Sequence, residues 1–333
     1  LKAELGRDAT HAELAAKLGV AVADIPAVEE AERNPYERGG FSLYDVSNKA
    51  KPKLIHFQKT HGRGVHRFDM DKDYAYISTE MPGFIGNILV TYDIRNPAKP
   101  EEVSRWWMPG QHIAGGEKPT WSGRQHRLHH TLRFGNELWA GCWHGGVRVV
   151  DVTDIRQPKT TGAYNYHPPY PEPSHTFMPV LKKLDGKRIA VAIDEEDHAH
   201  DAEEMARRRG RPHGCLWVLD VTDLGNIKPV SLFEVSELDS PWSRTTPGRF
   251  GAHQFQENWK GGDTLLYCAW FAGGLRIVDI ADPSAPQEVG WYIPEPCGGK
   301  PCPQTNDTDV DDRGLVYLVD RYCGFDILEF NRK

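Results

Sequence analysis

Four histidines share one local pattern at distant points of the chain. Each is followed two positions later by an aromatic residue or leucine, in His66-Arg-Phe, His130-Thr-Leu, His175-Thr-Phe and His253-Gln-Phe. Asp307 begins a fifth segment of the same kind and supplies a carboxylate in place of the imidazole. Neutral imidazole suits zinc, copper, iron and nickel, and an added carboxylate extends the choice to manganese. The pattern therefore predicts one transition-metal ion, held by residues drawn from these five.

A repeated strand gives these distant residues a way to meet. Six segments are rich in β-branched and aromatic residues and carry Asp or Glu just before their last residue: 41–46, 88–94, 147–152, 216–221, 275–280 and 325–330. A turn and a further strand follow the first five, and two strands precede all but the first, so the unit is four antiparallel strands. Units of four strands repeating at this spacing are typical of a β-propeller. We expect an all-β propeller of five blades, or six if residues 1–40 contribute strands.

The two ends of the chain each provide an incomplete blade. Residues 41–58 offer only the outer two strands of a unit, whereas the C-terminal end offers three. Strands from both ends would complete one blade and remove a free sheet edge. We therefore expect a single propeller domain over 41–333, closed by both ends. Thr10-His-Ala-Glu13 forms a capping box ahead of an Ala- and Leu-rich stretch, which predicts that residues 1–40 are a short helical arm.

The innermost strands of a propeller bring their first residues together around the axis, so the histidines should converge on one face. The turns after the second strands should place Glu80, His144, Glu195 and Arg321 around them. A carboxylate there can orient a ligand imidazole or act as a general base, and Arg321 can hold an anionic group. These four are the candidate catalytic residues. The alternative interpretation is that the histidines line a wet channel and the others are ordinary turn residues.

Three functions remain open on this basis. A mostly imidazole ligand set favours iron or copper and an oxidase or oxygenase. A lyase or hydrolase would use zinc or manganese as a Lewis acid. A non-enzymatic binding propeller is the third. The insertion over 194–213, which contains His198 and His200, and the aromatic segment 164–174 would form a lid and a wall suited to a small organic substrate.

Composition narrows the choice of partners. A net charge of −7 with neutral histidines argues against general binding to nucleic acid or anionic membranes. No apolar run approaches the roughly 18 residues of a spanning helix, and no signal peptide is visible, which favours a cytoplasmic protein. Cys297 and Cys302 flank a turn and would pair in an oxidising compartment, while the other four cysteines are expected to be buried thiols. The oligomeric state stays open.

The segments Val147-Arg-Val-Val-Asp-Val and Leu275-Arg-Ile-Val-Asp-Ile-Ala-Asp-Pro resemble the LVIVD-repeat family of bacterial β-propellers. This resemblance covers 41–330 and implies the fold. The His129-His130 pair and Glu80-Met-Pro-Gly-Phe-Ile are similar to segments of the selenium-binding proteins. Those are propellers in which a histidine-lined site accompanies copper-dependent methanethiol oxidation, so this second resemblance implies a copper site.

Overall fold

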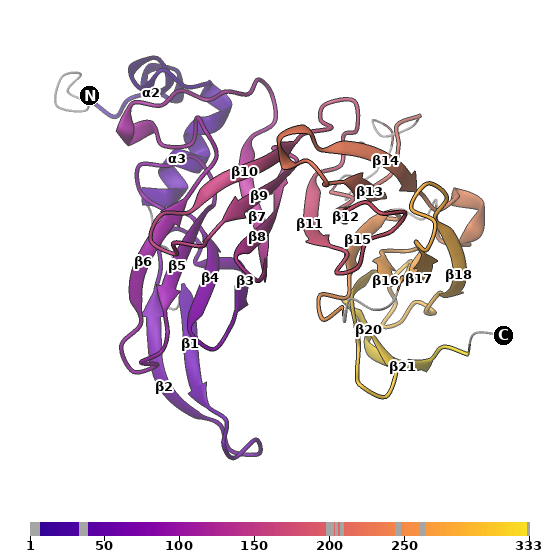
Figure 1. The fold of residues 1–333 in the computed structure, drawn as a ribbon. Helices are drawn as coiled ribbons and strands as arrows, with labels where there is room; N and C mark the ends of the chain where they lie inside the picture. The colour runs from indigo at the N-terminus through magenta and orange to yellow at the C-terminus, as the bar shows by residue number, and fades with distance from the viewer. Residues whose placement is uncertain are drawn as a thin grey trace. The chain divides into compact units, whose positions relative to one another are not determined.

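The computed structural model describes residues 7–32, 39–197, 203, 206, 210–243, 248–259 and 264–331. Its described part is all-β apart from short helical segments, and its sheets are antiparallel (Figure 1). The chain divides into two compact units. The first unit comprises Leu1–Leu138, Cys142–Gly145 and Val150–Thr160, and the second comprises Trp139–Gly141, Gly146–Val149 and Thr161–Lys333. None of the described helices has the length and apolar character needed to cross a bilayer.

The first unit begins with short helices. These are α2 (His11–Leu18), η1 (Val22–Asp24) and α3 (Ile25–Glu32). The predicted capping box is confirmed: the Thr10 hydroxyl accepts a hydrogen bond from the Glu13 backbone N–H, and the Glu13 carboxylate accepts one from the Thr10 N–H. Gly19 ends α2 in the left-handed conformation, with φ of 71°, which glycine adopts without steric cost.

Two sheets of the first unit follow these helices. One has two strands, β1 (Gly40–Asp45) and β2 (Lys53–Lys59). The other has four strands in sequence order: β3 (Val65–Met70), β4 (Tyr74–Thr79), β5 (Ile88–Asp93) and β6 (Glu101–Trp106). Apolar residues of β4 and β5, including Ile77, Ile88 and Val90, are buried in its core. The 3-10 helix η2 (Ile113–Gly115) comes after β6.

The boundary between the units falls within β8 and β9. These strands belong to a run of four: β7 (His126–Phe134), β8 (Glu137–Trp143), β9 (Val147–Asp151) and β10 (Lys159–Tyr164).

The second unit continues the repeat. Strands β11 (Ser174–Pro179), β12 (Ile189–Asp194), β13 (Leu216–Asp220) and β14 (Lys228–Phe233) pair in sequence order. The next sheet contains β15 (Ala252–Phe255), β16 (Leu265–Trp270), β17 (Gly274–Asp279) and β18 (Gln287–Tyr292). A three-stranded sheet of β19 (Thr305–Val310), β20 (Leu315–Asp320) and β21 (Gly324–Glu329) comes last. The 3-10 helices η3 (Leu224–Asn226) and η4 (Glu237–Asp239) flank β14.

The six predicted acid-ended segments all form strands, namely β1, β5, β9, β13, β17 and β21. The structure also gives a reason for the recurring aspartate. In the first five, its side chain accepts the backbone N–H two residues later, at 2.8 to 3.0 Å: Asp45, Asp93, Asp151, Asp220 and Asp279. Such a bond starts the tight turn into the next strand. Repeated antiparallel sheets of this kind make the fold propeller-like.

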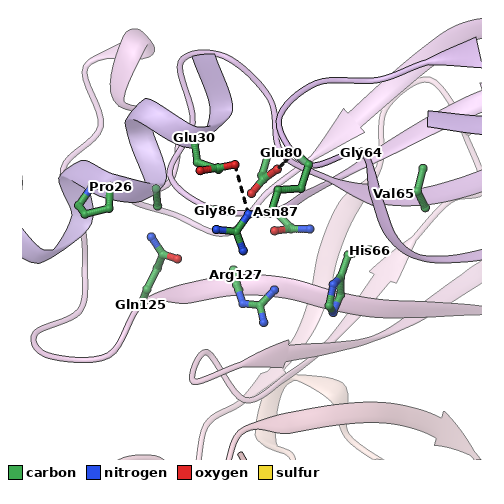
Figure 2. Close-up of a pocket in the computed structure, with 12 residues that line it drawn as sticks. Pro26, Glu30, Gly64, Val65, His66, Glu80, Gly86, Asn87, Gln125 and Arg127 are labelled. Atoms are coloured by element: carbon green, nitrogen blue, oxygen red, sulfur yellow. Dashed lines mark hydrogen bonds and ion pairs between the residues drawn. The ribbon is translucent and has the colours of Figure 1, made fainter. Parts of the chain in front are cut away.

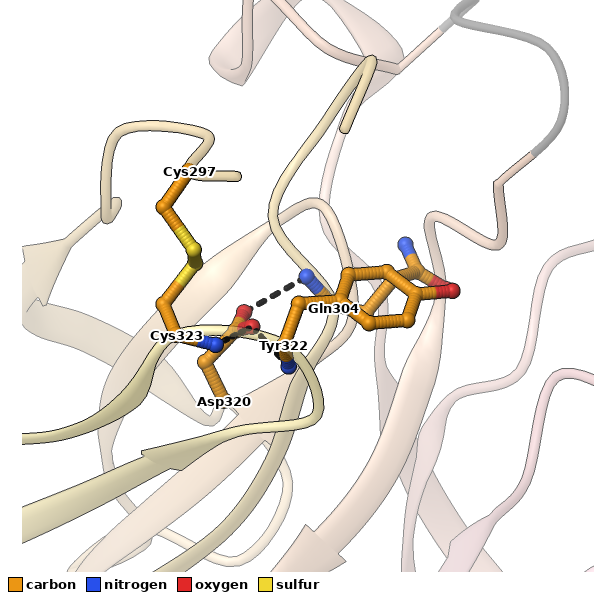
Figure 3. The surroundings of a disulfide bond; sticks show 5 residues. All are labelled: Cys297, Gln304, Asp320, Tyr322 and Cys323. Carbon is orange, nitrogen blue, oxygen red and sulfur yellow. Dashed lines mark hydrogen bonds between the residues drawn. A yellow bond between two sulfur atoms is a disulfide. The ribbon is translucent and has the colours of Figure 1, made fainter. Parts of the chain in front are cut away.

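A disulfide joins Cys297 to Cys323 (Figure 3). The expected partner of Cys297 in an oxidising compartment, Cys302, is therefore wrong, and so is the expectation that Cys323 is a buried thiol. Cys302 is buried as a free thiol, as are Cys142, Cys215 and Cys268. Cys323 lies in the turn between β20 and β21, and its partner precedes β19. The bond therefore ties that turn to the segment entering the same sheet.

Candidate metal centre

A β-bulge interrupts several strands at one recurring position. The pairing register shifts by one residue near the start of β3, β11, β15 and β19. The residues that fall at these shifts are His66, His175, His253 and Asn306. A bulge leaves one residue out of the ladder and redirects its side chain, and bulges of this kind are common beside active sites. Three of the four predicted histidines therefore occupy the same special backbone position.

Strand β7 carries the corresponding position at His129. In two sheets of the second unit, the residue before the bulge donates its backbone N–H to a carbonyl of an earlier part of the chain. Ala252 donates to the Gly214 carbonyl at 3.1 Å, and Thr305 donates to the Phe271 carbonyl at 3.0 Å. In the first unit Leu128 makes the same bond, to the Asn87 carbonyl at 2.9 Å. The residue after this bond is His129 in β7 and the bulged Asn306 in β19, next to the predicted His130 and Asp307. The assignment of His130 and Asp307 as ligands stays a prediction.

In the second unit, Glu195 faces two of these histidines. Its Oε2 lies 3.9 Å from Nε2 of His175, and its Oε1 lies 3.6 Å from Nε2 of His253. The two imidazole rings are 4.4 Å apart between centroids, and all three residues are buried. His175 and Glu195 offer ligand atoms within 4.8 Å of each other, which is close enough to share one metal ion. This cluster of histidine and glutamate could hold a metal.

The other ring nitrogens of these histidines are engaged. Nδ1 of His253 hydrogen-bonds the backbone carbonyl of Asn306, and Nδ1 of His175 lies 2.7 Å from Oγ1 of Thr176. A carbonyl only accepts, so Nδ1 of His253 carries a proton, and in the neutral ring Nε2 carries the lone pair. A metal ion bound between this nitrogen and the Glu195 carboxylate would satisfy both acceptors. Metal-binding histidines are commonly oriented by such a bond to the far nitrogen.

Two arginines hold the Glu195 carboxylate in place. Nη1 of Arg249 donates to Oε1 at 2.9 Å, and its side chain is only 5% exposed. Nη2 of Arg321 lies 3.8 Å from the same oxygen. The Phe271 ring packs against both guanidinium groups, whose central carbons are 3.8 and 5.3 Å from its centroid. The arrangement leaves the other carboxylate oxygen, Oε2, on the side of His175.

The turn that carries Arg321 is held from several directions. The Asp320 carboxylate accepts backbone N–H groups from Gln304, Tyr322 and Cys323 at 2.6 to 3.1 Å, beside the disulfide (Figure 3). Arg321 itself donates its backbone N–H to the Gln304 carbonyl and its Nε to the Asn306 side chain. The predicted arginine is therefore fixed near Glu195, while 39% of its side chain stays exposed.

A buried network next to Glu195 had no signal in the sequence. Asp194 accepts hydrogen bonds from the Tyr166 hydroxyl at 2.7 Å and from Nε1 of Trp217 at 3.0 Å. Ser174 donates to the same Tyr166 hydroxyl at 2.6 Å, and Tyr166 stacks on Trp217. Burial raises the pKa of Asp194 to about 7. Since Ser174 and Asp194 precede His175 and Glu195 directly, this network anchors both strands that present the cluster.

The first unit contains a second pair of neighbouring histidines. The rings of His66 and His129 lie 4.6 Å apart between centroids, and His129 stacks on Trp143 at 5.1 Å. Burial, with help from nearby His66 and Arg127, holds the pKa of His129 well below its usual value, so the ring is neutral as a metal ligand must be. Nε2 of His130 lies 3.1 Å from the Phe68 carbonyl.

The remaining predicted residues lie in varied surroundings. Glu80 accepts the backbone N–H of Arg63 and lines a pocket with His66. His144 is buried in the turn after β8, edge-on to Trp143. Asp307 is half-buried on β19 and accepts the N–H of Thr308 at 2.9 Å. His198 and His200 lie outside the described residues.

Comparison with known proteins supports the repeat. Residues 264–293, which contain β16 to β18, match the LVIVD repeat model, and this confirms the resemblance predicted for that segment. None of the curated proteins matches the sequence significantly.

Several solved structures are similar in fold. A protein from Lactobacillus plantarum has a TM-score of 0.59 at 11% identity, over 90% of this chain and 82% of that chain. A complex of KlAtg21 with the coiled coil of AgAtg16 gives a TM-score of 0.52 at 9% identity, over 88% and 75%. A hypothetical selenium-binding protein from Sulfolobus tokodaii gives a TM-score of 0.39 at 13% identity, over 83% and 77%. The first two show likeness of fold alone, and the third similarity is too low to carry an argument.

Proposed function

We propose that this protein is a metal-dependent enzyme that acts on a small organic substrate. One observation carries the proposal: a buried glutamate, Glu195, faces Nε2 of both His175 and His253, and the far nitrogen of each ring is already engaged. We propose these three residues as the core of the ligand set. His66, His130 and Asp307 are the further candidates predicted from the sequence.

The donor set favours oxidation with dioxygen as the oxidant. Two histidines and one carboxylate with open positions suit iron(II) oxygenases, and imidazole also suits copper. The metal would supply the redox chemistry. The chain's own residues would orient the reactants: Arg249 holds the carboxylate, and Arg321, still partly exposed, would bind an anionic group of the substrate. Glu80 and His144 remain candidate catalytic residues predicted from the sequence.

The metal that supports activity distinguishes an oxidase from a lyase or hydrolase. A lyase or hydrolase would take zinc or manganese at the same donors, where the ion polarises a carbonyl or lowers the pKa of a bound water. The test loads metal-free protein with iron(II), copper, zinc or manganese in turn and measures dioxygen uptake with panels of small organic acids, thiols and phenols. Uptake with iron or copper that is lost in His253→Ala supports an oxidase. Turnover only with zinc or manganese, and no uptake, contradicts the oxidase assignment.

We also propose that the sheets are blades of one closed propeller of five blades. Support comes from the period of the repeat and from the ends of the chain. Tyr44 on β1 and Leu54 on β2 are exposed apolar residues, as are Phe325 and Ile327 on β21. Pairing of the two ends would cover them. In a Tyr44→Cys, Ile327→Cys variant, a bismaleimide should crosslink the two cysteines within one chain. In the control variant Tyr44→Cys, Leu181→Cys it should not. Equal crosslinking in the two variants would contradict closure of the propeller.

A further inference from the structure

A pocket in the second unit shares no residue with the pocket that Glu80 and His66 line (Figure 2). Its volume is about 450 Å³, which is within the usual range of small-molecule sites. Its wall is built from η4 and the residues that follow it, from β17 and β18, and from the segment after β18. None of the residues proposed for the metal centre lines this pocket.

A buried arginine holds the parts of this wall together. Arg276 on β17 has a side chain that is 1% exposed, and its Nη2 donates to the Asp239 backbone carbonyl at 3.0 Å. Its Nη1 lies 3.2 Å from the Glu288 carboxylate of β18, and its Nε donates to the Gly273 carbonyl at 2.8 Å. These bonds engage all three guanidinium nitrogens and tie η4 to β17 and β18. The wall is therefore fixed by the protein's own contacts.

The pocket carries an excess of negative charge. Arg276 and Glu288 form an ion pair and balance each other, whereas Asp239 and Glu295 add two further carboxylates to the wall. Both of these residues are exposed, and neither forms an ion pair with another residue in the described part of the chain. A cleft lined by charge of one sign concentrates ligands of the opposite sign. The charge of this pocket therefore favours a cation.

Large apolar side chains lie exposed in the same pocket. Trp291 on β18 is 64% exposed, and Leu238 on η4 is 87% exposed. Trp242, which is half-buried, and Ile293 also line it. Exposed apolar surface that gathers in a groove is typical of a binding site. Tryptophan is also the side chain whose ring attracts cations most strongly, so the apolar and the acidic parts of the wall favour the same kind of ligand.

We infer that this pocket binds a small organic cation that carries a quaternary ammonium group. Such a group has no N–H to donate, so its methyl groups can pack on Trp242 and Trp291 while the ring faces attract its charge. Asp239 and Glu295 add to this attraction. An inorganic cation would gain nothing from the apolar wall, and a primary ammonium group would need acceptors for three N–H donors. The site goes beyond the proposed metal chemistry and does not depend on it.

Ligand-observed NMR titration of the purified chain with three probes tests the inference. Choline carries the quaternary ammonium group, 3,3-dimethyl-1-butanol has carbon in place of its nitrogen and is neutral, and ethanolamine carries a primary ammonium group. Choline should bind at least about tenfold more tightly than either of the others. Equal binding of choline and the neutral alcohol would overturn the inference in favour of a purely apolar pocket. Equal binding of ethanolamine, or no saturable binding of choline, would also overturn it.

Variants of the wall then locate the binding. Trp291→Leu keeps an apolar side chain at this exposed position but removes the ring, and it should weaken choline binding by about fivefold or more. The double variant Asp239→Asn with Glu295→Gln removes both charges with little change of shape and should weaken it by a similar factor. Wild-type affinity in either variant would overturn the assignment.

Matched controls change the same kinds of residue outside the pocket. Phe68→Leu removes an exposed aromatic ring from β3, and the double variant Glu101→Gln with Glu102→Gln removes two exposed carboxylates from β6. Both should bind choline as the wild-type protein does. Near-ultraviolet circular dichroism checks that every variant is folded. An equal loss of affinity in the controls and in the wall variants would contradict a site in this pocket.

Discussion

Replacing Glu195 with alanine should destabilise the protein, because it leaves the Arg249 guanidinium without its carboxylate. The two groups are 2.9 Å apart, and their side chains are only 5% and 11% exposed. Breaking a buried ion pair by removing one partner costs about 3–5 kcal/mol. Arg249 keeps a 3.4 Å bond to the Glu196 carbonyl and its contact with Phe271. We therefore expect a loss near the lower end, about 3 kcal/mol of unfolding free energy.

Urea unfolding of metal-free protein measures this loss. Glu195→Gln retains an acceptor for Arg249 and should cost less, about 1–2 kcal/mol. Glu101→Ala breaks the exposed contact with Lys99 and should change the unfolding free energy by at most about 0.5 kcal/mol. The double change Glu195→Leu with Arg249→Leu should be less destabilising than the sum of the two single changes. A cost below about 1 kcal/mol for Glu195→Ala would refute the reasoning.

Three further predictions concern the second unit and the cysteines. The Cys297–Cys323 bond closes a loop with a sequence separation of 26, so replacing both cysteines with serine should lower the unfolding free energy by about 3.5 kcal/mol. A reductant should destabilise the wild-type protein but not this serine variant. The free thiols are buried, and burial raises the pKa of two of them, Cys215 and Cys268. An aromatic disulfide reagent should therefore modify Cys142, Cys215, Cys268 and Cys302 only after the protein unfolds. Rapid reaction of these thiols in the native protein would contradict this prediction. Burial raises the pKa of Asp194 to about 7, above its value in the unfolded chain, so the folded state keeps this proton to a higher pH than the unfolded state does. Stability should fall by roughly 4 kcal/mol as pH rises from about 4 to 7, and Asp194→Asn should remove this decline in urea titrations at several pH values.

The strands could be predicted because their signals are local. Alternating β-branched residues identify β5, β9, β13 and β17, and the aspartate at each end makes a bond only two residues away. The capping box at Thr10 is local in the same sense. Interactions within a few residues leave a pattern in one sequence, and these predictions hold for that reason.

Register and distant pairing could not be predicted in this way. A bulge moves a side chain without changing the strand pattern, so the sequence pattern does not show that Asn306, beside the predicted Asp307, is the bulged residue. Cys323 looks like part of a strand, and nothing near it points to Cys297. Asp194 meets Tyr166 and Trp217 only through the sheet. Each of these depends on contacts between segments that are far apart in the chain.

The central claim is that His175, His253 and Glu195 hold a metal ion. Elemental analysis by mass spectrometry of untagged protein, never exposed to a chelator, tests it most directly. We predict about one transition-metal ion per chain, lost in His175→Ala with His253→Ala and retained when the exposed His61 is replaced by alanine. The same measurement on His66→Ala and His130→Ala tests the predicted ligands of the first unit. Metal-free wild-type protein, or an unchanged metal content in the double variant, would contradict the account.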